Sequence, residues 1–200
     1  MPRTAHCSRH ERAKHEIGRP QVYIFGEVEG AVPCWPLVRL YCSWRLVFDS
    51  TKWVVIQGET EGETFDSGSC SQGFCVWNQP IAVHLACRSL QGWPRLELVV
   101  RGSDSHGRQR LAGYGSCAVP LVPGAREVLC RCWRLTGDGM CARLRAFLVG
   151  IVPELLVSSM LSDHSRSRPT LKTEDSVDVL VRLSIVHQNF PQNSVETGRP

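Results

Sequence analysis

The chain has 200 residues, of which 42% are hydrophobic and 21% charged, a composition that fits a globular domain and excludes a disordered chain. This length suits one domain with a substantial core. The formal net charge of +4 is modest and lacks the dense basic stripe of nucleic-acid-binding proteins, so no nucleic-acid partner is predicted. No apolar run approaches the ~20 residues of a membrane-spanning helix.

The amino-terminal segment, residues 1–20, is basic and His-rich and lacks the apolar stretch of a secretory signal peptide. We predict a disordered extension over 1–20, a folded domain over 21–190 and a tail over 191–200. Without a signal peptide, the ten cysteines are expected in a reducing compartment, where structural disulfides are rare. We therefore predict free thiols, with Cys42, Cys87 and Cys117 packed as small hydrophobic residues in strands.

Short apolar or alternating runs, separated by turn-forming residues, predict a series of β-strands. The predicted strands are 22–28, 39–48, 52–57, a short one near Phe65, 74–77, 81–87, 96–100, 111–119, 128–135 and 177–185. Pro80 lies between two of them, which suits an edge strand or a bend. The apolar spacing predicts one short helix over 140–149, and the polar composition predicts an exposed loop over 158–176. Many short strands and one helix indicate an all-β sandwich.

The segment from Leu90 to Pro120 carries the most informative pattern in the chain. Gly92-Trp93-Pro94 precedes the predicted strand 96–100, and Gly113-Tyr114-Gly115 interrupts the predicted strand 111–119. Glycine weakens a strand unless it marks a bulge or a place where another part of the chain comes close. We therefore expect close packing around these glycines, and we expect Trp93 to pack in the core.

This segment resembles the B9 domain, a divergent relative of the C2 β-sandwich. The matching residues are Gly92, Trp93, Pro94, Asp104, Gly107, Leu111, Ala112, Gly113, Tyr114, Gly115, Val119 and Pro120. The resemblance extends over about residues 21–190. It implies an all-β fold, namely a C2-like antiparallel β-sandwich.

The same resemblance implies a function. B9 domain proteins are subunits of the tectonic-like, or Meckel-syndrome (MKS), complex at the ciliary transition zone. The chain is then expected to be a non-catalytic structural subunit, needed for cilium assembly and for the membrane diffusion barrier. Its expected location is the cytoplasm and cytoskeleton, at the ciliary basal body and transition zone. Its expected partners are other B9 domain proteins and subunits of the tectonic-like complex.

Metal and cofactor sites are not predicted. A C2 domain that binds calcium needs several carboxylates in its end loops, because the ion takes about six to eight oxygen ligands. Laying that ligand spacing on Asp104 places Gly102 and Arg110 at the other positions, so Asp104 is expected to serve a turn. The Cys130–Cys132 pair lacks zinc-site spacing. No nucleophile or nucleotide-binding motif is present, and Cys117 is expected to be an inert buried thiol, so no enzyme is predicted.

Exposed tryptophan and arginine side chains are the candidate contact residues. Tryptophan can anchor a partner or a lipid interface, and arginine can meet an acidic partner or lipid phosphate, although solvated surface charge is the commoner explanation of the arginines. The candidates are Trp35, Trp53, Arg108, Arg110, Arg143 and Arg145. The alternative function is a C2-like, calcium-independent peripheral module that binds phospholipid on an anionic membrane surface.

Overall fold

The computed structural model describes residues 18–33, 39–68, 73–103, 107–135 and 173–193. The strands are β1 (Gln21–Pro33), β2 (Arg39–Val47), β3 (Trp53–Gly58), β4 (Glu61–Glu63), β5 (Cys75–Cys87), β6 (Arg95–Ser103), β7 (Gln109–Ala118), β8 (Gly124–Leu135) and β9 (Thr173–Gln188), and a 3-10 turn, η2 (Pro191–Asn193), follows. Within these residues, no helix is long and apolar enough to cross a membrane. The predicted helix over 140–149 lies outside the described residues.

The predicted all-β class is confirmed, with differences at three strands. The predicted strands 74–77 and 81–87 form one strand, β5, in which Asn78 adopts a φ of 48°. Pro80 pairs with β1 on one side and lies beyond the last residue of β5 that pairs with β3. At Pro80, β5 is therefore an edge of the sheet, which confirms the predicted edge position. The short strand predicted near Phe65 corresponds to β4, which ends two residues before Phe65. The loop predicted over 158–176 is wrong at its end, because β9 already begins at Thr173 and Ser176 is buried.

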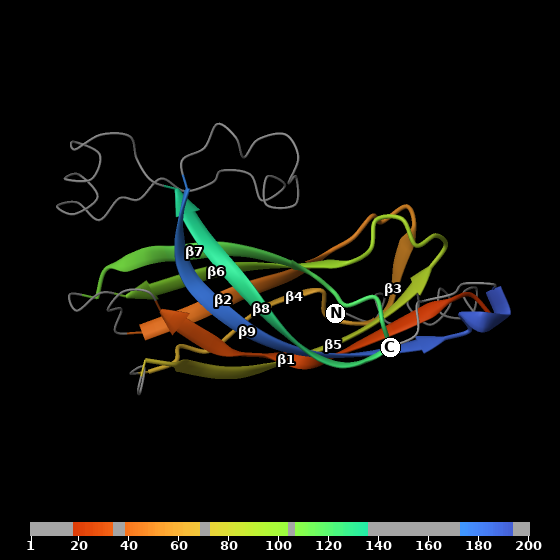
Figure 1. Ribbon diagram of the computed structural model, residues 1–200, viewed down its shortest axis with the longest axis horizontal. Helices are drawn as coiled ribbons and strands as arrows, with labels where there is room; N and C mark the ends of the chain where they lie inside the picture. Colours follow the sequence, from red (N-terminus) through yellow and green to blue (C-terminus); the bar gives the residue numbers. More distant parts are fainter. Residues whose placement is uncertain (1–17, 34–38, 69–72, 104–106, 136–172, 194–200) are drawn as a thin grey trace, which may run out of the picture.

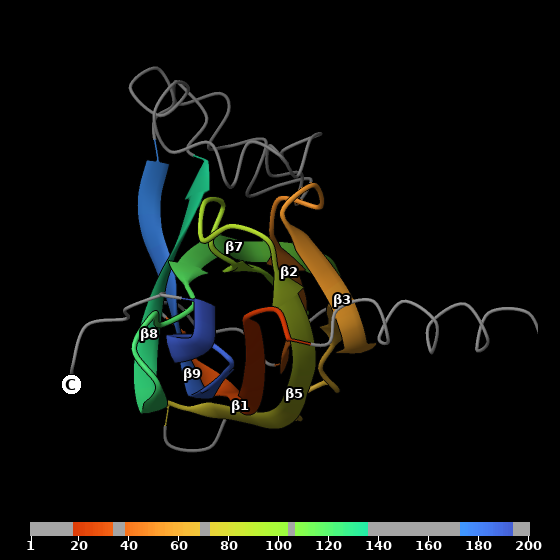
Figure 2. The same cartoon turned by 90° about the vertical axis from the view of Figure 1, so that its right-hand side faces the viewer.

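All nine strands belong to one antiparallel sheet in the order β3-β5-β1-β9-β8-β7-β6-β2-β4. The sheet curls until its two halves face each other, with β8 and β9 crossing the molecule as a diagonal ribbon in Figure 1. In the end view, the strands are arranged around a common centre (Figure 2). Buried apolar side chains of these strands form a hydrophobic core cluster. The indole N–H of Trp77 in β5 donates to the carbonyl of Leu40 in β2 at 2.9 Å, so the two halves are also joined by a hydrogen bond.

The two ends of the sheet, β3 and β4, are consecutive in the chain. The link between them is fixed to β2, because the amide N of Leu46 donates to the carbonyl of Thr60 at 2.7 Å. Gly58 begins this link with a φ of +96°, and a Cβ atom there would overlap the carbonyl oxygen of Ala82 in β5. Glycine is therefore required where the chain leaves one half of the sheet for the other.

Strand alternation fills the core. In β9, Val177, Val179, Val181, Leu183 and Ile185 are all buried, which confirms the predicted half-buried strand. Residues 18–20, which the sequence assigned to the extension, are hydrogen-bonded to the domain. The amide N of Cys87 donates to Pro20, and Asn189 donates to the carbonyl of Arg19. Residues 1–17 and 194–200 lie outside the described residues, so disorder in the predicted extension and tail stays a prediction.

Candidate interaction surfaces

The Gly92-Trp93-Pro94 motif packs against the turn between β2 and β3. Gly92 adopts a φ of +68°, and a Cβ atom there would lie 2.8 Å from the Cβ atom of Asp49. The Asp49 carboxylate holds this turn by accepting from the Thr51 hydroxyl at 2.6 Å and from the Thr51 amide at 3.0 Å. These hydrogen bonds lower the pKa of the Asp49 carboxyl, with Lys52 adding to the effect. Asp49 is therefore a turn residue, and Gly92 is needed for the close approach.

Trp93 of this motif packs against a second tryptophan, Trp53 of β3. Trp53 is 1% exposed, and its ring meets that of Trp93 edge to face at a centroid distance of 5.2 Å. The indole N–H of Trp93 donates to the carbonyl of Val119 at 2.8 Å, and that of Trp53 donates to the carbonyl of Gln91 at 3.3 Å. Trp93 is half-buried and packs against the hydrophobic core, which confirms its predicted packing role. The prediction of Trp53 as a contact residue is wrong, because its side chain points into the core.

The Gly113-Tyr114-Gly115 motif lies where β7 passes over two thiols of β8. A Cβ atom on Gly115 would lie 2.6 Å from the sulfur of Cys132 and 2.8 Å from that of Cys130. One on Gly113 would lie 3.2 Å from the Cβ atom of Cys132. The expected close packing at these glycines is therefore confirmed. On the other face of β7, the ring of Tyr114 lies 5.6 Å from that of Trp133, its register partner in β8.

The cysteines beneath this motif are free and buried. Each of Cys42, Cys117, Cys130 and Cys132 has a free thiol that is buried in the described part of the chain. Burial raises the pKa of the Cys42 thiol, and a hydrogen bond with Cys130 together with burial raises the pKa of Cys117. Neither thiol is a nucleophile near neutral pH, which confirms the expectation for Cys117.

Cys75 differs from the other described cysteines because it is disulfide-bonded, and its partner lies outside the described residues. The prediction that all thiols are free is therefore wrong at this position. That prediction rested on the missing signal peptide, which carries no information about which sulfur atoms the fold brings together.

The buried thiols predict a loss of stability at alkaline pH. In the unfolded chain these thiols ionise near their ordinary pKa of 9.0, whereas in the folded domain they stay protonated to higher pH. The contribution of these thiols to the free energy of unfolding should therefore be constant well below pH 9 and fall above it, by about 1.4 kcal/mol per pH unit for each thiol that ionises only in the unfolded chain. Urea denaturation at pH 7, 8, 9 and 10 measures this fall. A Cys42→Ala variant should show a shallower slope, and equal slopes in the two proteins would contradict the assignment.

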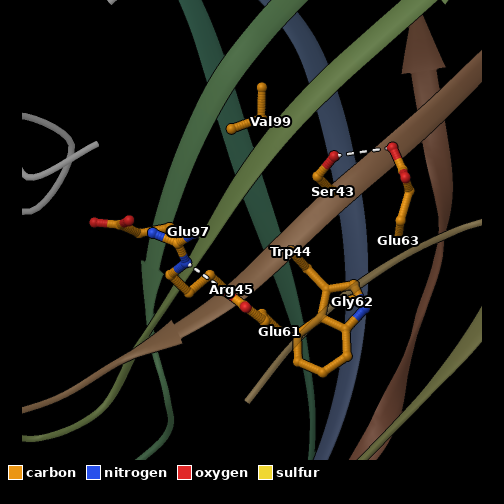
Figure 3. Close-up of a pocket in the computed structure, with 8 residues that line it drawn as sticks. All are labelled: Ser43, Trp44, Arg45, Glu61, Gly62, Glu63, Glu97 and Val99. Atoms are coloured by element: carbon orange, nitrogen blue, oxygen red, sulfur yellow. Dashed lines mark hydrogen bonds and ion pairs between the residues drawn. The ribbon is translucent and has the colours of Figure 1, made fainter. Parts of the chain in front are cut away.

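A shallow hollow of about 390 Å³ lies on β2, β4 and β6 (Figure 3). Its lining residues are Ser43, Trp44, Arg45, Glu61, Gly62, Glu63, Glu97 and Val99. The Ser43 hydroxyl donates to Glu63 at 3.1 Å, and the Nε atom of Arg45 donates to Glu61 at 3.0 Å. The hollow is acidic, with three carboxylates and one guanidinium. Nevertheless, no group of three or more metal-ligating side chains is placed to hold an ion among the described residues.

The predicted contact arginines are only partly within the described residues. Arg108 is exposed just before β7, beside Gly107, whose φ is +75°. Arg110 is half-buried and pairs with Gly102 across the β6–β7 ladder. These two residues occupy the outer positions of the calcium-ligand spacing laid on Asp104, and neither is a carboxylate. Trp35, Asp104, Arg143 and Arg145 lie outside the described residues. Pro120 is half-buried after β7.

Sequence reasoning missed a cluster of charges on the outer face of β1, β8 and β9. The guanidinium of Arg182 lies 3.2 Å from a carboxylate oxygen of Glu27, 3.1 Å from one of Glu29 and 3.3 Å from one of Glu127. The pKa of Arg182 is raised, first by its hydrogen bond with Glu127 and then by the charge of Glu29. The four side chains come from three strands, so they lie together only because of the order of the strands in the sheet. The sequence offered one signal for this cluster, the alternation along β1, which places Phe25, Glu27 and the other odd-numbered residues before the bulge on one face of the strand.

The fold and these surfaces define an all-β sandwich domain whose conspicuous glycines, tryptophans and thiols serve its own packing. A family model described as "Ciliary basal body-associated, B9 protein" (B9-C2) matches residues 22–186, and the chain belongs to this family. The predicted resemblance to B9 domain proteins is thereby confirmed.

Individual relatives agree with the family match. The chain is 35% identical over 176 residues to B9 domain-containing protein 2 of Bos taurus, covering 88% of this chain and 98% of that protein. Identity to B9 domain-containing protein 2 of Homo sapiens is 34%, with the same coverage. B9 domain-containing protein 1 of Xenopus laevis is 24% identical over 162 residues, 80% of each chain. A solved C2 domain of plant Extended Synaptotagmin 1 aligns with a TM-score of 0.39 and 12% identity, covering 82% of this chain and 92% of that one.

Proposed function

We propose that this chain is a non-catalytic structural subunit of the tectonic-like (MKS) complex at the ciliary transition zone, where it supports cilium assembly and the membrane diffusion barrier. The family match over residues 22–186, to proteins described as ciliary basal body-associated, is the observation that carries the proposal. The partners are other B9 domain proteins and further subunits of the complex. The chain acts in the cytoplasm and cytoskeleton, at the basal body and transition zone.

The state of the reactive side chains supports a structural role over catalysis. A nucleophile needs a base within hydrogen-bond reach and a pKa that allows ionisation. Cys117 has a raised pKa and sits in the core. His84 is engaged with the side-chain oxygen of Gln21 at 2.8 Å and stacks on the ring of Tyr23 at 3.9 Å. Burial lowers the pKa of His84, so it is neutral at pH 7 and serves packing.

The position of the full chain in a ciliated cell tests the proposal. A fluorescently tagged copy should form a focus between basal-body and axonemal markers, and other B9 domain proteins should co-purify with it. The tag expressed alone is the control and should stay diffuse. A tagged chain that is diffuse, or that labels membranes generally, would contradict a transition-zone subunit.

Calcium-independent phospholipid binding is the second candidate function. The exposed Arg108 beside the positive-φ turn at Gly107 favours it, because an arginine at a loop end can meet lipid phosphate. Sedimentation with phosphatidylserine vesicles distinguishes the two functions. Lipid binding that Arg108→Glu and Arg110→Glu abolish supports the peripheral membrane module. A structural subunit should instead keep its focus between the markers when Arg108 is changed to Glu.

A further inference from the structure

The outer face of β5, β1 and β9 carries apolar side chains, although the outward face of an antiparallel sheet is ordinarily polar. Phe25 is 45% exposed and Val186 is 50% exposed. Tyr23 pairs with Val186 across the β1–β9 ladder, and its ring stacks on that of Phe25 at 6.0 Å. Ala82, the register partner of Phe25 in β5, is exposed as well. We name these four residues, together with the Arg182 cluster beside them, the Phe25 face.

The Arg182 cluster gives this face a negative charge. One guanidinium meets the three carboxylates of Glu27, Glu29 and Glu127, which leaves an excess of negative charge. The ion pairs hold these side chains in place before any partner arrives. Pre-ordered side chains lose less entropy on binding, which favours their use in an interface.

The acidic cluster lies between two apolar rows. Glu27 follows Phe25 by two residues on the same face of β1, and Leu129 follows Glu127 in the same way on β8. Residues at this spacing are about 7 Å apart along a strand. Leu129 is 51% exposed, and its register partner Leu180 is half-buried. A complementary surface would therefore place a basic group between two apolar groups, each about 7 Å from it.

We infer that the Phe25 face docks another B9 domain protein through a basic side chain flanked by apolar ones. The inference rests on the proposed function for the identity of the partner, whereas the chemistry follows from the face itself. Aromatic and arginine side chains are enriched among the residues that dominate binding energy. Apolar contacts on both sides would exclude water from the charged row, which strengthens its attraction to a basic group.

The charge of the face argues against two other occupants. An anionic lipid surface would bring phosphate groups against the carboxylates of Glu27 and Glu127. A second copy docked by two-fold symmetry would bring the same acidic row against itself. Both arrangements place like charges together, whereas a basic partner does not.

Matched substitutions test the docking face on the full chain. The probe is purified B9 domain-containing protein 1 of Xenopus laevis, a relative of this chain. Phe25→Ser and Glu127→Lys should each weaken binding about tenfold or more. Phe65→Ser and Glu59→Lys are the controls, since Phe65 is 85% exposed and Glu59 is exposed between β3 and β4. Each control should change the affinity less than about twofold, and all four variants should remain folded at the temperature of the binding assay.

The outcomes separate the docking face from the proposed function. If the unchanged chain binds and the Phe25 and Glu127 variants bind equally well, the docking face is wrong and the proposed function stands. Equal losses in the control variants also contradict this location. If the unchanged chain does not bind, both the B9 partner and the docking face are rejected. Self-association, or binding to phosphatidylserine vesicles, that Phe25→Ser abolishes would replace the proposed occupant by a second copy or a membrane.

Discussion

Changing Gly58 to alanine should lower the free energy of unfolding by about 2–4 kcal/mol. Overpacking accounts for about 1–3 kcal/mol of this and the left-handed backbone for roughly 1 kcal/mol. The added Cβ atom would overlap the carbonyl oxygen of Ala82 and lie 2.9 Å from the Cα atom of Val83. Both atoms are backbone of β5, which is paired with β1 on its other side. They cannot move without disturbing the sheet.

Gly68 provides the matched control for this substitution. Its φ of +64° is also left-handed, but no atom lies within 4 Å of the Cβ position. Gly68→Ala should therefore cost about 1 kcal/mol, the backbone share alone. Urea denaturation of the two variants measures the difference. Equal losses of stability would show that β5 does not crowd Gly58.

Changing Trp53 to alanine should cost about 3–5 kcal/mol, as for large aromatic residues removed from a core. The side chain is 1% exposed, and the variant loses both the edge-to-face contact with Trp93 and the hydrogen bond to Gln91. Thermal and urea denaturation give the change. Phe65→Ala, at an 85% exposed position, should alter stability by less than about 0.5 kcal/mol.

The same variant distinguishes a core residue from a contact residue. A contact residue would leave the melting temperature unchanged and weaken partner binding. A core residue lowers the melting temperature whether or not a partner is present. Unchanged stability of Trp53→Ala would therefore restore the sequence-based expectation for this side chain.

Local patterns made most of the strands predictable. Alternation in β9 and the glycines of β7 are short-range signals, and both correspond to what the structure shows. The burial of Trp53 was not predictable from such signals, because it depends on Trp93, which follows far along the chain. The hydrogen bond from Trp53 to Gln91 spans 38 residues. The disulfide at Cys75 is a further feature that the sequence did not reveal.

The Phe25 face was missed because strand order does not follow chain order. β1 lies between β5 and β9, and β9 lies between β1 and β8. Phe25, Ala82 and Arg182 therefore share one surface although each comes from a different part of the sequence. Sequence patterns indicated the inward and outward sides of each strand, but not which outward sides are neighbours.

The position of β9 has a consequence for biosynthesis. Of the nine described strands it is the last to be made, yet it is the partner of both β1 and β8. The Tyr23 hydroxyl donates a hydrogen bond to the side-chain oxygen of Gln188, 165 residues further along the chain. β1 can therefore pair with β9 only after all the strands between them have been synthesised. Such long-range pairing folds slowly and leaves strand edges open to wrong partners meanwhile. A chain truncated before Thr173 would lack the strand that joins β1 to β8, so the edges of β1 and β8 that β9 normally pairs would stay open.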